Sequence, residues 1–199
     1  MPEYYRNTSA EKSAFLSGIA EERRRSGIRW LVLVSLGLAI LTGLSAQVRI
    51  PLPVSPVPVT GQVFVVLLIG FLFGKKLGLG SQIAYAGLGS LGIPWFAGMA
   101  GGLTVLAGPT GGYILGFLPA VYLIGWLGDN FDSKSYLARF LIGLAGLVTI
   151  YCFGAAQLSL FLNLSPLKTL ELGVLPFIWV DLIKVLVLSV TVEWFSSVD

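Results

Sequence analysis

The chain contains no histidine, a single cysteine and few charged residues. Asp, Glu, Lys and Arg make up only 12% of its 199 residues, whereas a soluble domain has about 25%. The absence of histidine argues against zinc, haem and imidazole acid–base chemistry, so we expect neither a metal nor a cofactor. Cys152, the one cysteine, has no internal partner for a disulfide.

What is abundant is apolar. Hydrophobic residues make up 55% of the chain, and it has 25 glycines. This composition predicts an all-α integral membrane protein with closely packed helices. Six segments are expected to be transmembrane helices: Ile28–Ala46, Val59–Phe73, Leu77–Leu91, Gly111–Gly128, Ala138–Leu162 and Leu172–Phe195. A tight turn is expected at Lys75 and Lys76, and an extended connection through the prolines of residues 51–58.

The basic residues indicate the orientation. Most of the 13 Lys and Arg residues fall in the N-terminal tail, at Lys75 and Lys76, and between Lys134 and Arg139. By the positive-inside rule, both termini are expected in the cytoplasm of a multi-pass plasma-membrane protein. We expect residues 1–27 to form a basic cytoplasmic segment and residues 28–199 to form the six-helix membrane domain. A capping box from Thr8 to Glu11 favours a short amphipathic helix in the tail, although a plain topogenic tail is equally consistent.

Two opposite charges, Asp181 and Lys184, lie within the last apolar segment. Each would cost roughly 2.5–3.5 kcal/mol at the centre of a membrane, so such residues usually have a function. Their spacing of three places them on one face of a helix. They either neutralise each other or bind a polar ligand.

The connection at residues 92–113 is apolar but too rich in Gly and Pro for one regular helix. Non-helical backbone near a membrane must pack within protein or line a cavity. We expect this segment to form a lid on the outer side, above a binding site. The alternative is that it is an ordinary extracellular connection between two helices. Tyr85, Phe96 and Tyr113 are expected to enclose a small organic molecule with an apolar ring system.

Small residues recur at intervals of four on the first span, at Ser35, Ala39 and Gly43. Such a face admits the close approach of another helix, either a partner helix or one from the same chain.

Several functions are disfavoured by missing motifs. Residues 108–112 superficially suggest a phosphate loop, but GxxxxGK[ST] does not occur. The chain has no Ser-His-Asp, Cys-His or HExxH arrangement, so we expect no enzymatic activity. A chain placed almost entirely in the bilayer is not expected to bind nucleic acid.

Taken together, these segments resemble the biotin-specific substrate-binding (S) components of energy-coupling-factor (ECF) transporters, the BioY family. The resemblance covers roughly residues 28–195. It rests on the stretch from Arg49 to Gln62, the lid residues 89–98 and 101–106, the GPTGGYILGF segment at residues 108–117, and the PFIWVDLIK segment at residues 176–184.

The resemblance implies a six-helix S-component fold that binds biotin from the outer side, beneath the lid. It implies that Asp181 and Lys184 contact the ligand and that the lid, with Phe96 and Gly98, contributes to the site. It also implies a transmembrane coupling protein and two cytoplasmic ATPases as partners, in addition to membrane lipids. In the family the coupling protein engages the small-residue face of the first helix.

Three alternatives remain open. The chain is an S component for another vitamin, a proton-coupled secondary transporter with Asp181 as its proton site, or a scaffold whose ion pair fixes helix packing. No inverted repeat, which secondary transporters often have, is visible in the sequence.

Overall fold

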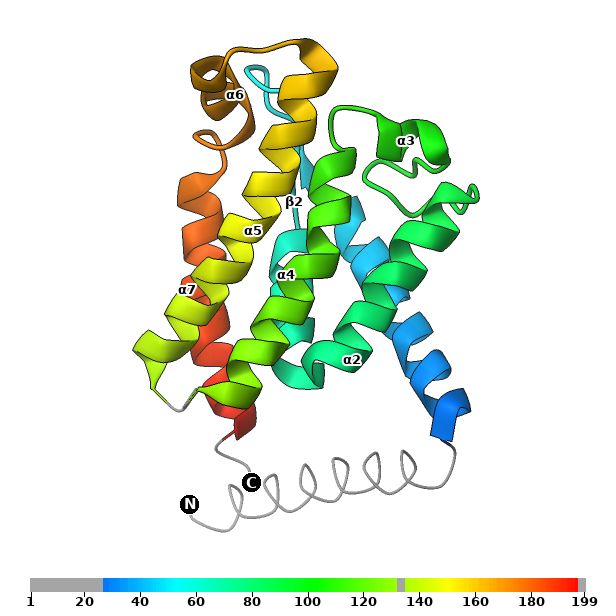
Figure 1. Cartoon of the computed structure of the whole chain (residues 1–199), viewed down its shortest axis with the longest axis vertical. Coiled ribbons are helices and arrows are strands. Elements are labelled where there is room, and N and C mark those ends of the chain that lie inside the picture. Colours follow the sequence, from blue (N-terminus) through cyan, green and yellow to red (C-terminus); the bar gives the residue numbers. More distant parts are fainter. Residues whose placement is uncertain (1–26, 132–134, 197–199) are drawn as a thin grey trace.

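The structure is a computed structural model that describes residues 27–131 and 135–196. The helix expected between residues 8 and 20 lies outside these ranges. The described part is mostly helical, with one two-stranded sheet (Figure 1). After the first membrane helix, Gly27–Gln47, come β1 (Arg49–Ile50), β2 (Val59–Thr60), α2 (Gln62–Ser90), α3 (Leu103–Ala107), α4 (Gly111–Asn130), α5 (Tyr136–Leu162), α6 (Pro166–Gly173) and α7 (Ile178–Ser196).

The strands β1 and β2 form a short antiparallel hairpin around the proline-rich segment. Arg49 pairs with Thr60, and Ile50 pairs with Val59. The second span therefore begins later than predicted, because Val59 belongs to β2 and the helix starts at Gln62. Ser55, in the hairpin loop, donates a 2.6 Å hydrogen bond to the carbonyl of Leu172 and so ties the loop to α6.

Helix α2 contains the second and third predicted spans, with a sharp break at Gly74. The backbone there has φ 69° and ψ −178°, which favours a residue without Cβ. The predicted turn at Lys75 and Lys76 is thus placed one residue too late. Helix α4 approaches this break closely, since a Cβ on Gly125 would collide with the backbone of Lys75. In Figure 1 the two arms of α2 diverge from the break.

The last predicted span, Leu172–Phe195, is wrong as one straight helix. Helices α6 and α7 are bent by 56° relative to each other. The residues between them include Pro176, which cannot donate a backbone hydrogen bond to continue a helix. The Tyr113 hydroxyl donates a 2.7 Å hydrogen bond to the carbonyl of Gly173, which fixes α4 to the bend.

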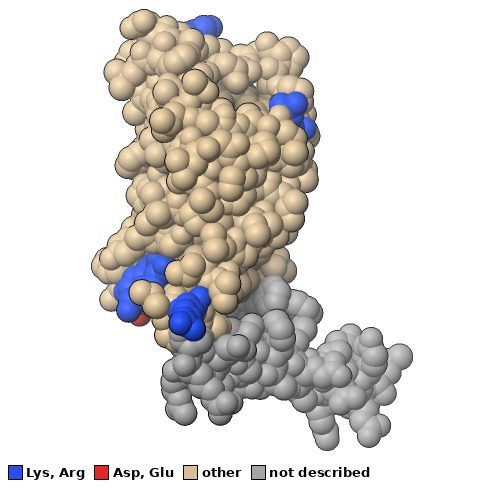
Figure 2. All heavy atoms as spheres, turned by 90° about the vertical axis from the view of Figure 1, so that its right-hand side faces the viewer, with Lys and Arg blue, Asp and Glu red and all other residues tan. Residues whose placement is uncertain are grey.

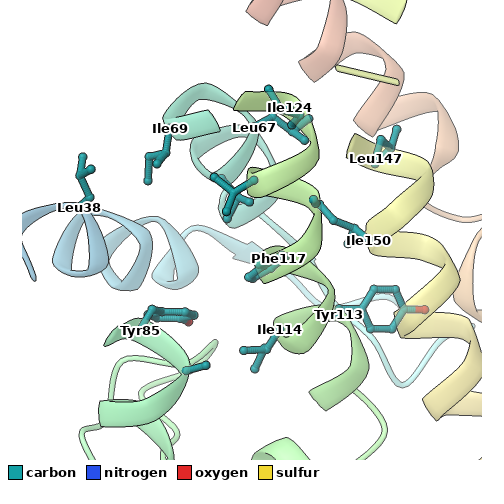
Figure 3. Close-up of a cluster of buried hydrophobic side chains, with 14 of the residues drawn as sticks. Leu38, Leu67, Ile69, Tyr85, Tyr113, Ile114, Phe117, Ile124, Leu147 and Ile150 are labelled. Carbon is teal, nitrogen blue, oxygen red and sulfur yellow. The ribbon is translucent and has the colours of Figure 1, made fainter. Parts of the chain in front are cut away.

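By length and composition, the described residues contain four helices able to cross a membrane. The number of candidate membrane spans rises to five if the bent pair of α6 and α7 is counted as one span. Helix α4 lies between α2 and α5, as Figure 1 shows, and packs extensively against both. Gly70 of α2 and Gly146 of α5 admit the Ile124 side chain, since a Cβ on either would lie within 3 Å of it. Apolar side chains from these helices pack together and form the buried core (Figure 3).

Candidate ligand-binding site

A cavity of about 360 Å³ opens at the end of the molecule that carries the β-hairpin and α3. The hairpin, the segment before α4 and the first turns of α4 form its wall. Its apolar surface includes the rings of Phe96, Tyr113 and Phe117. Its polar groups come from Arg49, Thr60, Gln62, Thr104 and Thr110. Rings with a few polar groups are typical of sites for small organic molecules.

Residues 92–110 cover one side of the cavity and are called the lid below. The prediction of an irregular segment here is confirmed, since only the five residues of α3 are helical. The N–H of Phe96 donates a 2.9 Å hydrogen bond to the carbonyl of Ala100, which closes a tight loop. Within that loop Gly98 has φ 80° and Met99 has φ 58°. The left-handed backbone turns the lid back on itself.

Arg49 carries the cationic group among the residues that line the cavity. Its guanidinium lies directly against Gly98, where a Cβ would collide with it. The hairpin and the lid therefore meet at these two residues. Gly98 contacts Arg49 and is not itself part of the cavity lining.

Tyr113 and its neighbours on α4 face in different directions. In Figure 3, Tyr113 points toward α5, whereas Ile114 and Phe117 point toward the arm of α2 that carries Tyr85. The Tyr113 ring packs flat on α5 at Gly154, where a Cβ would collide with it. Tyr113 thus lines the cavity, and its hydroxyl is fixed at Gly173.

Tyr85 lies behind the cavity wall. Its side chain is fully buried, and its ring meets Phe96 edge-on with centroids 5.3 Å apart. Its hydroxyl accepts a 2.7 Å hydrogen bond from Gln62 Nε2 and donates to the Trp95 carbonyl at 3.3 Å. In this structure Tyr85 supports Phe96 and does not line the cavity.

Asp181 and Lys184 form the ion pair that their spacing predicts. Lys184 Nζ lies 2.7 Å from Asp181 Oδ1, and both side chains are largely buried. Tyr151 donates a 2.7 Å hydrogen bond to Asp181 Oδ2. Lys184 also donates to the Thr60 carbonyl at 2.7 Å.

This network does not lie in the cavity wall itself. Neither Asp181 nor Lys184 lines the cavity, but Thr60 does. The ion pair is therefore joined to the cavity through one backbone carbonyl of β2. Direct contact between the two charges and a ligand stays a prediction.

The small-residue face of the first helix is turned inward. Ala39 is fully buried, and Ser35 nearly so. A Cβ on Gly80 of α2 would lie 2.7 Å from Ser35 Oγ, and one on Gly43 would lie 2.9 Å from Trp95 Cβ. In this structure these residues pack within the chain, as the alternative of internal packing predicts. They do not form a surface that faces a partner.

Several site residues were not predicted from the sequence. Tyr151 and Gln62 are single polar residues in apolar segments, and nothing in their spacing indicates their partners. Arg49 and Thr60 flank the prolines of the hairpin. Only the pairing of β1 with β2 brings them to the cavity.

In residues 27–131 and 135–196, no cluster of three or more His, Cys, Asp or Glu side chains could hold a metal ion. The cavity is suited to an organic molecule that bears rings and an anionic or polar group.

The fold and the cavity define a multi-pass helical membrane protein with a small-molecule site at one end. Residues 15–198 match the BioY family model, and the chain belongs to this family. It is 42% identical over 139 residues to the biotin transporter BioY of Thermotoga maritima, covering 69% of this chain and 80% of the relative. It is 44% identical over 152 residues to the probable biotin transporter BioY of Pyrococcus horikoshii. This match covers 76% of this chain and 86% of the relative.

A solved structure agrees with this assignment. The crystal structure of the S-component for biotin from an ECF-type ABC transporter superposes with a TM-score of 0.75. The two chains are 28% identical, and the match covers 84% of this chain and 90% of the other.

Proposed function

We propose that this protein is the substrate-binding subunit of an ECF-type importer and that it captures biotin in the cavity beneath the lid. The observation that carries the proposal is the cavity of about 360 Å³. This volume falls in the lower part of the range of about 300–1,000 Å³ for small-molecule sites, which suits a vitamin. The biotin transporters among the relatives support the same ligand.

The groups of the cavity match the two ends of biotin. Biotin joins a fused ring system with a ureido group to an aliphatic chain that ends in a carboxylate. Phe96, Tyr113 and Phe117 offer apolar surface to the rings and chain. Arg49 offers a bidentate partner to the carboxylate.

The ion pair of α7 completes the proposal. Asp181 accepts hydrogen bonds from the ureido N–H groups, and Lys184 donates to an oxygen of the ligand. The Lys184 ammonium has three N–H donors, and its bonds to Asp181 and to the Thr60 carbonyl use two of them. Tyr85 and Gly98 affect binding indirectly. Tyr85 packs against Phe96, and Gly98 lies against Arg49, so each supports a residue that lines the cavity.

Energy for import comes from other subunits. A transmembrane coupling protein and two cytoplasmic ATPases are the proposed partners, since the chain has no phosphate loop. On the face shown in Figure 2, the larger patches of Lys and Arg lie at the end opposite the hairpin, and smaller ones lie near the hairpin end. We propose that the end opposite the hairpin faces the cytoplasmic side of the plasma membrane, that both termini are cytoplasmic, and that the cavity faces outward.

The proposed fold has six membrane-crossing segments, because each arm of α2 counts as one. The break at Gly74 lies at the same end as the α4–α5 connection (Figure 1). The two arms, residues 62–73 and 75–90, therefore run in opposite senses between that end and the cavity.

Calorimetry with the purified protein tests the proposal. Tight biotin binding is expected, and thiamine or riboflavin added in excess should not compete with biotin for the site. Arg49→Gln should weaken the binding of biotin much more than that of biotin amide, which lacks the carboxylate charge. Absence of heat with biotin from folded protein would contradict the biotin assignment, and equal losses for both ligands would contradict the role of Arg49.

A further inference from the structure

One side chain of the first membrane helix bonds the lid at three points. Gln47 Nε2 donates hydrogen bonds of 3.2 Å to the carbonyls of Trp95 and Phe96. Gln47 Oε1 accepts a 3.0 Å hydrogen bond from the N–H of Met99. A primary amide is the neutral side-chain group that offers both donors and an acceptor, so it suits this mixed set of backbone groups.

The shape of the lid depends on the same contact. The positive φ angles of Gly98 and Met99 turn the Met99 N–H toward Gln47. A left-handed conformation is uncommon for a residue with a side chain, so Met99 needs support from its surroundings. Met99 itself is exposed, and the support comes from its backbone bond to Gln47.

A second contact joins the first helix to the lid one turn earlier. Gly43 lies against Trp95, so closely that a Cβ would be 2.9 Å from Trp95 Cβ. Gln47 Nε2 also donates a 3.0 Å bond to the carbonyl of Gly43, which orients the amide, so its two N–H groups are shared among three carbonyls. A displacement of this helix end relative to α2 must therefore disturb Trp95 and Gln47 together.

The contact reaches the cavity through Phe96. This residue is fully buried, lines the cavity and contributes the carbonyl that Gln47 holds. The other end of the lid is held separately. There, Gln157 of α5 donates to the carbonyls of Leu106 and Gly108 at 2.6 and 2.7 Å.

We propose that Gln47 is a positioning residue that latches the lid, and Phe96 with it, to the first membrane helix, so that a bound ligand is released only when this latch opens. The identity of the ligand rests on the proposed function, but the latch does not.

Ligand release tests the latch directly. Gln47→Asn keeps the amide but shortens its reach by one methylene, and Gln47→Leu removes the hydrogen bonds at similar volume. With labelled biotin bound and unlabelled biotin in excess, both variants should release label at least about tenfold faster, as expected for the loss of two to three hydrogen bonds. Asn130→Ala is the control, because Asn130 also bonds a backbone carbonyl but lies at the far end of α4. Release at the parent rate from folded Gln47 variants would overturn the proposal.

Hydrogen exchange in the ligand-free protein separates the latch from the identity of the ligand. Gln47→Asn should accelerate exchange at residues 96–102 and leave residues 106–111 unchanged. Gln157→Asn should produce the opposite pattern. If the parent does not bind biotin but these patterns appear, the latch stands and the biotin assignment fails. If biotin binds tightly but exchange at residues 96–102 stays at the parent rate in Gln47→Asn, the latch fails alone.

Discussion

The ammonium of Lys184 lies 2.7 Å from the carbonyl oxygen of Thr60, a residue 124 positions earlier in the chain. Thr60 ends the hairpin and lines the cavity, so the charged group of the last helix holds one wall of the site. The same ammonium pairs with Asp181. A change at this ion pair is therefore expected to alter both stability and ligand binding.

Lys184→Met should destabilise the protein strongly and abolish biotin binding. It leaves the buried Asp181 without its cation, a loss that typically costs about 3–5 kcal/mol. For a chain of this size that corresponds to a fall in melting temperature of roughly 6–20 °C. Thermal unfolding in detergent and calorimetry with biotin measure the two effects.

A neutral double variant separates stability from binding. Asp181→Asn with Lys184→Met contains no unpaired buried charge, so it should unfold at a higher temperature than Lys184→Met alone. It should still fail to bind biotin. Lys168→Met, which breaks an exposed pair with Glu171, is the control and should cost about 1 kcal/mol or less. Full biotin binding by the double variant would refute a ligand role for the ion pair.

Tyr151→Phe should weaken the network without removing a charge. The variant loses the 2.7 Å hydrogen bond to Asp181 Oδ2. A hydrogen bond to a charged group contributes about 1.5–3 kcal/mol, so a stability loss of this size is expected. Tyr122→Phe, on an exposed part of α4, should leave unfolding unchanged. Equal melting temperatures for the two variants would mean that the hydroxyl of Tyr151 does not matter to Asp181.

Gly154→Ala should reduce the affinity for biotin by moving a ring in the cavity wall. A Cβ at this position collides with the Tyr113 ring, which must shift toward the cavity. We expect lower affinity and lower thermal stability, measured by calorimetry and thermal unfolding. Gly87→Ala is the matched control, because a Cβ there meets no atom within 4 Å. An unchanged affinity in Gly154→Ala would show that the position of Tyr113 does not affect binding.

The orientation can be tested with single cysteines. In a Cys152→Ser background, Lys76→Cys marks the break in α2 and Lys168→Cys marks α6. An impermeant maleimide added to intact cells should label position 168 and not position 76. Labelling at position 76 and not at position 168 would contradict the proposed orientation and indicate the reverse one.

The sequence predicted those features that depend on local periodicity. The spacing of Asp181 and Lys184 places them on one helix face, and the pair is bonded as that spacing implies. Glycine and proline in the lid predicted irregular backbone, and only α3 is helical there. Long apolar runs predicted the first helix, α4 and α5 to within two residues at each end.

Features that depend on contacts between distant segments could not be predicted. The recurrence of Ser35, Ala39 and Gly43 indicates close approach, but only the fold shows that α2 and Trp95 approach them. Tyr151 reaches Asp181 because α5 packs against α7 in one particular register. Pro176 marks a local break before α7, but the contacts of α6 with Tyr113 and Ser55, which lie far away in sequence, are set only by the fold.

The break at Gly74 also has a consequence for the surrounding lipid. At 1.5 Å per residue, the arms at residues 62–73 and 75–90 are only about 18 Å and 24 Å long, whereas α5 is about 40 Å long. The hydrocarbon core of a bilayer is about 30 Å thick. Acyl chains next to the arms of α2 are therefore expected to compress or tilt, whereas α5, which is longer than this core, is expected to tilt. We therefore expect the membrane to be thinner beside α2 than beside α5, and bilayers of shorter lipids should accommodate the α2 side with less deformation.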